Sequence, residues 1–171
     1  MAFPLGKLGQ SSPTPEITES ECDLLPHIDI DKVMCLNEKR SGSGRSVIAS
    51  ISRLESDCDE QLIVVVPFKT NVKLSQILLT VTSLDLNFDD VSEIKPIQTI
   101  KIDPSQLAGH KEGGATKINL PIDKLKFQDV AFLTIFVESN IGEGEVSEIN
   151  HLALIGIPKM TMKLQNWEPS G

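Results

Sequence analysis

Short apolar runs separated by turn-forming residues recur along most of this chain, and they constrain its fold more than any other feature. Apolar and polar residues alternate in most of these runs, and such alternation indicates strands with one face against a core. The runs are VIASI (47–51), LIVVVPF (62–68), NVKLSQILLTV (71–81), IQTIKI (97–102), TKINLPI (116–122), VAFLTIFVE (130–138), INHLALIGI (149–157) and MTMKLQNW (160–167). Many short strands with turns between them predict an all-β sandwich of two sheets.

Three of the runs predict finer detail. LIVVVPF (62–68) is apolar at every position, which predicts a strand buried on both faces. In NVKLSQILLTV (71–81) the apolar phase shifts halfway along, and a β-bulge would produce that shift. In VAFLTIFVE (130–138), Phe132 and Phe136 are expected on the face opposite the aliphatic residues.

Little helix is expected. Asp31 is a candidate cap for one turn over 32–36, with Val33 and Leu36 facing inward. Pro104 suits the first position of a second turn over 104–109. NEKRSGSGRS (37–46) is rich in Gly and Ser, so a surface loop is expected there.

The chain is expected to form one domain. Its 171 residues are an ordinary single-domain length, and no internal repeat is evident. Residues 1–27 contain four prolines and are expected to be a flexible N-terminal segment. Residues 28–165 are expected to form the sandwich, and 166–171 a C-terminal tail.

The net charge of −8 disfavours nucleic acid and membrane surfaces as partners, because both are anionic. No apolar run approaches the ~20 residues of a membrane span, and the N-terminus MAFPLGKLGQSS lacks the apolar core of a signal peptide. Three cysteines without a CxxC spacing are expected to be free thiols in a reducing compartment. A metal cluster of Cys22, His27 and Cys35 would lack a fourth ligand.

The stretch LESDCDEQLIVVVPF (54–68) raises the sharpest question about chemistry. Its acidic residues surround Cys58 and are Glu55, Asp57, Asp59 and Glu60. A calcium loop of the EF-hand type would need Gly where Leu62 stands and Glu where Phe68 stands. A looser carboxylate site remains an alternative to the simpler interpretation, a polar turn before a buried strand. The carboxylates are expected to raise the pKa of the Cys58 thiol, which disfavours a nucleophile.

No other motif indicates catalysis or a cofactor. The glycine stretches 42–46 and 141–148 lack the features of a phosphate loop and are expected to be turns. The histidines His27, His110 and His151 have no local signature of an activated nucleophile beside them. We therefore predict no enzyme activity, no cofactor and no metal.

A cationic segment stands out on this acidic chain. Lys39, Arg40 and Arg45 lie within the nine residues 37–45, which also hold two glycines and two serines. They are interpreted either as a solvated loop or as a docking patch for an acidic protein surface, where charge sets orientation and association rate.

Several segments together resemble the PITH domain. The matching segments are IDIDKVMCLNEKRSGSGRSVI (28–48), LESDCDEQLIVVVPF (54–68), NVKLSQI (71–77), LNFDDVSE (86–93), FLTIFVESN (132–140) and HLALIGI (151–157). They occur in the order found in that family and cover roughly Ile28 to Ile157. CLNEKRSGSGR is more similar to the stand-alone PITH-domain proteins than to the thioredoxin-fused protein.

The resemblance implies a jelly-roll β-sandwich similar to galactose-binding-like domains. It also implies a non-catalytic module that binds the regulatory particle of the 26S proteasome in the cytosol and nucleus; we expect a monomer. The family's characteristic acids match Glu55, Asp57, Asp59 and Glu60, and its loop matches Asn37 to Arg45. These four acids and the three cations Lys39, Arg40 and Arg45 are the candidates for partner binding.

The sequence departs from the family pattern at two places, and two other functions stay open. Only LLTVTSLD (78–85) stands where the family usually carries a further strand, and the tail at Trp167–Gly171 is short. Because the chain has no CxxC, disulfide exchange is not expected. A small-ligand or carbohydrate-binding sandwich is the main alternative, for which Trp167 is the single tryptophan; an undetected hydrolase or redox enzyme is the other.

Overall fold

The computed structural model describes residues 20–81, 95–103, 105, 116–138 and 145–159. Within these residues the strands are β1 (Cys22–Asp23), β2 (Met34–Leu36), β3 (Leu54–Glu55), β4 (Leu62–Val81), β5 (Thr116–Pro121), β6 (Val130–Val137), β7 (Glu148–Ile149) and β8 (His151–Pro158). The helical elements there are the 3-10 turns η1 (Leu25–His27) and η2 (Ile30–Lys32) and the α-helix α1 (Ser43–Ala49). None of these helices is long and apolar enough to cross a membrane.

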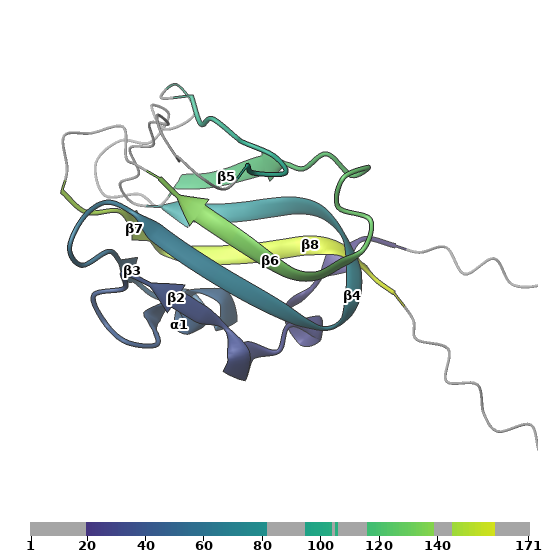
Figure 1. The fold of residues 1–171 in the computed structure, drawn as a ribbon, viewed down its shortest axis with the longest axis horizontal. Coiled ribbons are helices and arrows are strands. Elements are labelled where there is room, and N and C mark those ends of the chain that lie inside the picture. Colours follow the sequence, from purple (N-terminus) through teal and green to yellow (C-terminus); the bar gives the residue numbers. More distant parts are fainter. Residues whose placement is uncertain (1–19, 82–94, 104, 106–115, 139–144, 160–171) are drawn as a thin grey trace, which may run out of the picture.

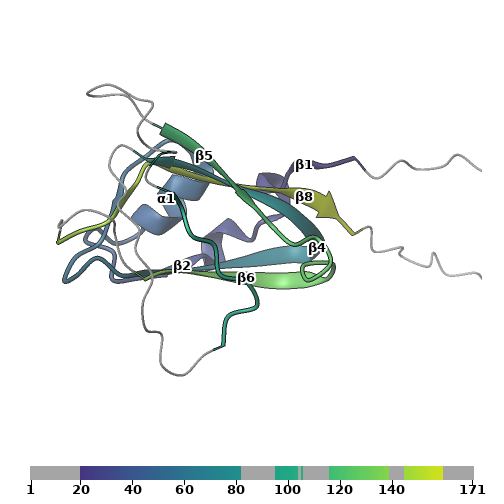
Figure 2. The same ribbon diagram turned by 90° about the horizontal axis from the view of Figure 1, so that it is seen from above.

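One long strand, β4, belongs to both layers of the molecule. Its first half pairs with β2 on one side and β6 on the other, and its second half pairs with β8 and β5. The register with β6 shifts between Pro67 and Val72, where β4 passes from one layer to the other. Figures 1 and 2 show the two layers and the bend of β4 that joins them, with β1 at the edge beyond β8. All pairs are antiparallel, as in a β-sandwich.

The core lies between the layers and is almost entirely aliphatic. On β4 the inward side chains Leu62, Val64 and Val66 have no exposed surface, because successive residues of a strand point to opposite faces. Helix α1 packs against β2, β3 and β8 and contributes Val47 and Ile48 to the same core. Burial of such side chains stabilises a fold by roughly 1.5–3 kcal/mol each.

The strand pattern of the sequence is largely confirmed. β5 and β6 lie within the predicted runs 116–122 and 130–138. β8 lies within the predicted run 149–157 except for its last residue, Pro158. The predicted bulge is present, since the register of β4 with β8 shifts between Leu74 and Gln76. The fold is the all-β sandwich that was expected.

The prediction of a strand at VIASI (47–51) is wrong. Residues 43–49 form α1, and the consecutive side chains Val47 and Ile48 are both buried, whereas Ile51 is 81% exposed. A strand would have placed those two neighbours on opposite faces. The segment NEKRSGSGRS was predicted to be a surface loop, but its last residues begin this helix, with Ser43 buried.

Two further predictions of local structure are also wrong. No strand forms at 97–102, although Ile102 is buried as its pattern indicated. The helical turn predicted over 32–36 lies earlier, at η2, and residues 34–36 form β2, with Leu36 exposed instead of inward. Residue Val33 is buried as expected.

The folded part reaches further toward the N-terminus than the predicted boundary at Ile28. Leu24 has no exposed surface, and its backbone N–H donates to the carbonyl oxygen of Leu154 at 2.8 Å. β1 pairs with β8 in the same region. The helical turn predicted at 104–109, the strand predicted at 160–167 and the tail 166–171 lie outside the described residues, apart from Ser105.

The shortened segment after Ile77 leaves no gap beside β4. Thr80 and Val81 still belong to that strand, and its last residues pair with β8 on one side and β5 on the other. The backbone N–H and C=O groups on both edges of this part of β4 therefore have partners, so no strand edge is left exposed there. Residues 82–85 of this segment lie outside the described part of the chain.

Candidate interaction surface

The two candidate segments of the sequence, 37–45 and 54–60, lie side by side. The N–H of Lys39 donates to the carbonyl oxygen of Glu55, and the N–H of Asp57 donates to that of Asn37, both at 2.9 Å. Between these bonds Glu38 pairs with Ser56 as an isolated bridge. The cationic and acidic candidates are thus parts of one structural unit at the end of the sandwich.

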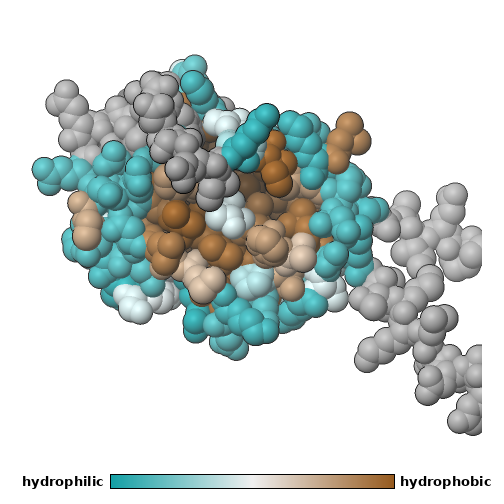
Figure 3. Space-filling model, in the orientation of Figure 1, coloured by the Kyte–Doolittle hydropathy of each residue, from teal (hydrophilic) through white to brown (hydrophobic). Residues whose placement is uncertain are grey.

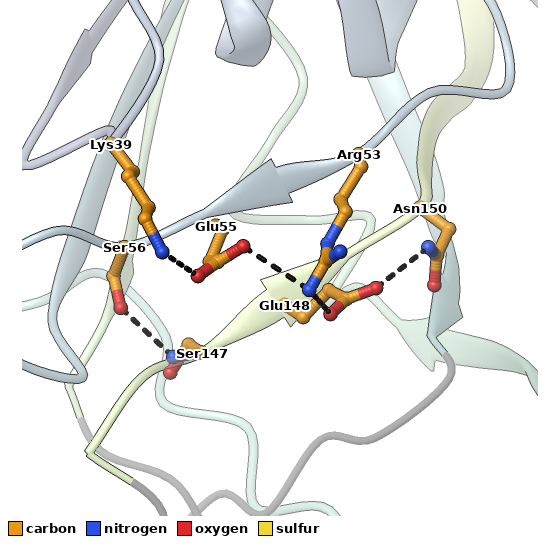
Figure 4. Close-up of polar contacts among 7 residues, drawn as sticks. All are labelled: Lys39, Arg53, Glu55, Ser56, Ser147, Glu148 and Asn150. Atoms are coloured by element: carbon orange, nitrogen blue, oxygen red, sulfur yellow. Dashed lines mark hydrogen bonds and ion pairs between the residues drawn. The ribbon is translucent and has the colours of Figure 1, made fainter.

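Within this unit, Lys39 and Glu55 bind each other (Figure 4). The Lys39 Nζ lies 2.5 Å from Glu55 Oε1, and the Arg53 guanidinium lies 3.1 Å from Glu55 Oε2 and 2.9 Å from Glu148 Oε2. Glu55 and Glu148 stand directly opposite each other on β3 and β7. Two like charges in that position repel, and Arg53 neutralises both. A hydrogen bond from Lys39 holds the pKa of Glu55 below its usual value.

Lys39 and Glu55 therefore pair with each other and help to hold this surface together. The two other members of the network, Arg53 and Glu148, were not predicted from the sequence. Arg53 follows α1, while Glu148 comes from a strand near the C-terminal end of the chain. Nothing in the local sequence indicates that pairing, because only the β3–β7 register brings the two together. Ser147 joins the same pairing by donating its N–H to Ser56 Oγ at 2.9 Å (Figure 4).

Asn37 organises the acidic turn 57–60. It has a left-handed backbone, with φ of 64°, and its Nδ2 donates to Asp59 Oδ1 at 2.6 Å and to the Gln61 carbonyl oxygen at 2.7 Å. Its Oδ1 accepts from the N–H of Cys58 at 3.1 Å. The simpler interpretation of the acidic stretch is the one observed: a polar turn that ends where β4 begins. Among the described residues, no group of three or more His, Cys, Asp or Glu side chains is placed to hold a metal ion.

The cysteines carry no feature of an activated nucleophile. Asp57 raises the pKa of the Cys58 thiol by its charge and by a hydrogen bond, in the predicted direction. Burial, followed by the charge of Glu38, raises the pKa of Cys35 to about 12. All three cysteines, with Cys22, are free thiols.

Replacing Asp57 by asparagine should make Cys58 react faster with iodoacetamide at neutral pH. The substitution removes the largest cause of the raised thiol pKa, so a larger fraction of Cys58 is thiolate. Alkylation rates of each cysteine, measured by mass spectrometry, test this, with the exposed Cys22 as internal control and Cys35 expected to be slowest. An unchanged rate ratio of Cys58 to Cys22 would contradict the assignment.

The three cations of the 37–45 segment have different environments. Arg45 donates from Nη2 to the carbonyl oxygen of Asp31 at 2.9 Å, and Lys39 binds Glu55 as described. Arg40 is exposed, and its side chain forms no ion pair with any described residue. Arg40 is therefore the member of the predicted patch whose charge is unpaired within the described part of the chain.

The carboxylate of Glu38 binds the first residues of α1, a role that the sequence did not predict. The carboxylate accepts from the N–H of Gly42 at 2.6 Å, from the N–H of Gly44 at 2.7 Å and from Ser43 Oγ at 3.1 Å. These bonds satisfy N–H groups at the beginning of the helix and place a negative charge beside its positive end. An acidic residue a few positions before a Ser–Gly pair is the sequence signal that could have indicated the helix.

The outward side of the layer formed by β2, the first half of β4 and β6 is apolar. The strand registers align its side chains in rows across the three strands, one row holding Met34 and Val65 and the next holding Leu36, Ile63 and Phe136. This outer apolar face consists of Met34, Leu36, Ile63, Val65, Pro67, Phe132, Thr134 and Phe136. Figure 3 shows hydrophobic side chains gathered at the centre of the side where β4 and β6 lie, within a hydrophilic rim.

The exposure of this face overturns the prediction that 62–68 is buried on both sides. Leu62, Val64 and Val66 are fully buried, but the alternate residues Ile63 and Val65 are only half-buried. Phe132 is 66% exposed, and Met34 and Leu36 are each 58% exposed. The apolar run does form a strand, as predicted, but no described residue of this chain covers its second face.

A small open pocket lies where the outer apolar face meets the acidic turn. Its volume is about 110 Å³, and its lining includes Leu36, Ile63 and Phe136 together with Asn37, Asp59 and Gln61. Phe136 is the only aromatic residue in this lining, and Trp167, the single tryptophan of the sequence, lies outside the described residues. The pocket therefore has apolar side chains on one side and the carboxylate of Asp59 on the other.

Comparison with known proteins identifies the family. Residues 14–170 match the PITH domain, nearly the full length of the chain. The chain belongs to the PITH domain family. The resemblance inferred from the sequence is thereby confirmed.

Relatives of this PITH domain include PITH domain-containing proteins and a thioredoxin-like protein. PITH domain-containing protein 1 of Xenopus laevis is 31% identical over 151 residues, which cover 80% of this chain and 70% of that protein. Thioredoxin-like protein 1 of Schizosaccharomyces pombe is 31% identical over 172 residues, which cover 90% of this chain and 57% of that protein. The chain thus spans little more than half of the thioredoxin-like relative.

The fold of this PITH domain is shared with carbohydrate-binding modules. The family 32 module of C. perfringens NanJ, solved in complex with galactose, superposes with a TM-score of 0.51 and 14% identity. The match covers 80% of this chain and 99% of the module. At that identity the similarity concerns the fold, and it confirms the galactose-binding-like sandwich.

Proposed function

We propose that this PITH domain is a non-catalytic protein-interaction module that binds the regulatory particle of the 26S proteasome. The observation that carries the interaction role is the outer apolar face, because contiguous exposed apolar surface on a folded domain marks a contact site for another molecule. The resemblance to the family supplies the identity of the partner. Cytosol and nucleus are the locations proposed with it.

The chemistry of the polar surface supports a binding role over a catalytic one. The raised thiol pKa values of Cys35 and Cys58 are opposite to what a cysteine nucleophile needs. The carboxylates of Glu55 and Glu148 are both paired with Arg53, and a hydrogen bond from Lys39 lowers the pKa of Glu55. The carbohydrate-binding alternative rests on the fold alone.

The test is direct binding of the purified protein to immobilised proteasome regulatory particle, measured by biolayer interferometry at low salt. Saturable binding with a defined stoichiometry is expected. Absence of binding, with a known regulatory-particle ligand as positive control, would overturn the proposed partner.

A charge reversal separates the cationic segment from the face. Arg40→Glu changes an exposed side chain without breaking an ion pair to a described residue, unlike changes at Lys39 or Arg45. If the face makes the contact, Arg40→Glu should bind the regulatory particle within about twofold of wild type, as rim charges contribute little affinity. A large loss of affinity would assign the contact to the cationic segment instead.

A further inference from the structure

We infer that the outer apolar face and the acidic turn beside it dock a protein segment that presents apolar side chains followed by a lysine or arginine. The inference rests on the proposed role as an interaction module and adds the chemistry of the partner surface.

The face offers a continuous apolar platform. Register pairs Ile63 with both Leu36 and Phe136, and Pro67 with Phe132, so these apolar residues are neighbours across the strands. Such cross-strand neighbours have Cβ atoms about 5 Å apart. A partner side chain laid along the row of Leu36, Ile63 and Phe136 therefore meets apolar groups, whereas the polar Thr134 lies in the row of Val65.

Three acidic side chains at the end of the face have no cation beside them in the described part of the chain. Asp57, Asp59 and Glu60 form no ion pair with any described residue, whereas the neighbouring Glu55 has two. Asp59 lies in the pocket of about 110 Å³ with Leu36, Ile63 and Phe136. Lysine and arginine suit such a pocket, because their methylene stems pack on apolar walls while their charged ends reach a carboxylate.

The negative charge beside the face also indicates which kind of molecule binds there. A second copy of this chain would bring a further net charge of −8, and nucleic acid would bring phosphates, so repulsion disfavours both. A sugar would find a single aromatic ring in the pocket. A protein surface with both apolar and basic side chains complements the face in hydrophobicity and in charge.

The experiment measures binding of full-length variants to two probes: purified proteasome regulatory particle, and a short synthetic peptide of alternating leucine and lysine. The face variant Leu36→Gln/Phe132→Gln changes two side chains that are already largely exposed, so folding is preserved. Asp59→Asn removes the charge and keeps an oxygen that accepts from Asn37 and Gln61. Circular dichroism and thermal unfolding verify that each variant folds.

Matched controls lie away from the face. Leu125→Gln removes an 86% exposed leucine from the turn between β5 and β6, and Glu21→Gln removes a carboxylate that pairs with Lys124 near β1. Both should bind within about twofold of wild type, since substitutions outside a contact are near neutral. A peptide of leucine and glutamate serves as the charge-reversed probe.

The face variant should weaken binding about tenfold or more, as buried anchor residues dominate an interface. Asp59→Asn should weaken binding and flatten its salt dependence, and the leucine–glutamate peptide should not bind. If either probe binds and both variants bind it like wild type, the inference is overturned and the proposed partner can stand. If the peptide binds through the face but the regulatory particle does not bind, the proposed partner is overturned and the inference stands. Binding of neither probe overturns both.

Discussion

Replacing Gly156 by alanine should destabilise the protein by about 3 kcal/mol, at the upper end for overpacking a core. A Cβ at this position would lie 2.1 Å from the carbonyl oxygen of Lys73, 3.0 Å from Leu24 Cδ1 and 3.1 Å from Leu74 Cα. Two of these atoms are backbone, at the bulge where β4 and β8 shift register. The added methyl group can be accommodated only by opening that ladder.

Urea unfolding of wild type and Gly156→Ala, followed by circular dichroism, measures the loss. The matched control is Gly42→Ala, at a glycine with φ of 82° and no atom within 4 Å of the added Cβ. That variant should lose only the cost of a left-handed alanine, about 1–2 kcal/mol. If Gly156→Ala were as stable as the control or more so, the close approach of β8 to β4 would be refuted.

Replacing Asn37 by alanine should cost about 2–3 kcal/mol, from lost hydrogen bonds and from backbone strain. The side chain donates to Asp59 and Gln61 and accepts from the N–H of Cys58. Its φ of 64° is one that asparagine tolerates and alanine does not. Losing these contacts should release the acidic turn from the start of β4.

Asn37→Gly separates the two contributions. Glycine accepts the left-handed backbone, so this variant should lose the hydrogen bonds alone and be more stable than Asn37→Ala by about 1 kcal/mol. Chemical denaturation of both variants provides the comparison. Equal stability of wild type and both variants would show that Asn37 does not hold the turn.

The sandwich was predictable because its strands carry their burial pattern in a few consecutive residues. Leu133 and Val137 are buried on β6 while Phe132 is exposed, as period-two alternation requires. The bulge in β4 was also visible, since inserting one residue changes which positions face the core. What those patterns could not indicate is whether anything covers the other side of a strand. Ile63 and Val65 have the composition of a doubly buried strand and lie on the outer apolar face instead.

Helix α1 was missed because short-range alternation at Val47, Ala49 and Ile51 mimics a strand. The helix depends on the carboxylate of Glu38, which binds the first N–H groups from outside the helical segment. It also depends on Gly44, where a Cβ would lie 2.4 Å from Cys35 Cβ. Both are tertiary conditions that an alternation pattern does not include.

The candidate residues were predicted singly, and their partnerships were not. Lys39 and Glu55 were assigned to two separate patches, yet they neutralise each other. Arg53 and Glu148 complete that network through the β3–β7 register, which no local motif encodes. Of the predicted residues, Asp59 has the clearest relation to the proposed docking surface, because it lies in the pocket at the end of the face.

The continuity of β4 through both layers has a consequence for communication across the molecule. Its first half carries the outer apolar face, and its second half is the neighbour of β8 and β5. Neither layer can open its backbone amides to solvent without disturbing the strand that it shares with the other, so the two behave as one cooperative unit. Occupancy of the outer face would therefore slow hydrogen exchange in β8, on the far side of the sandwich, without any contact there.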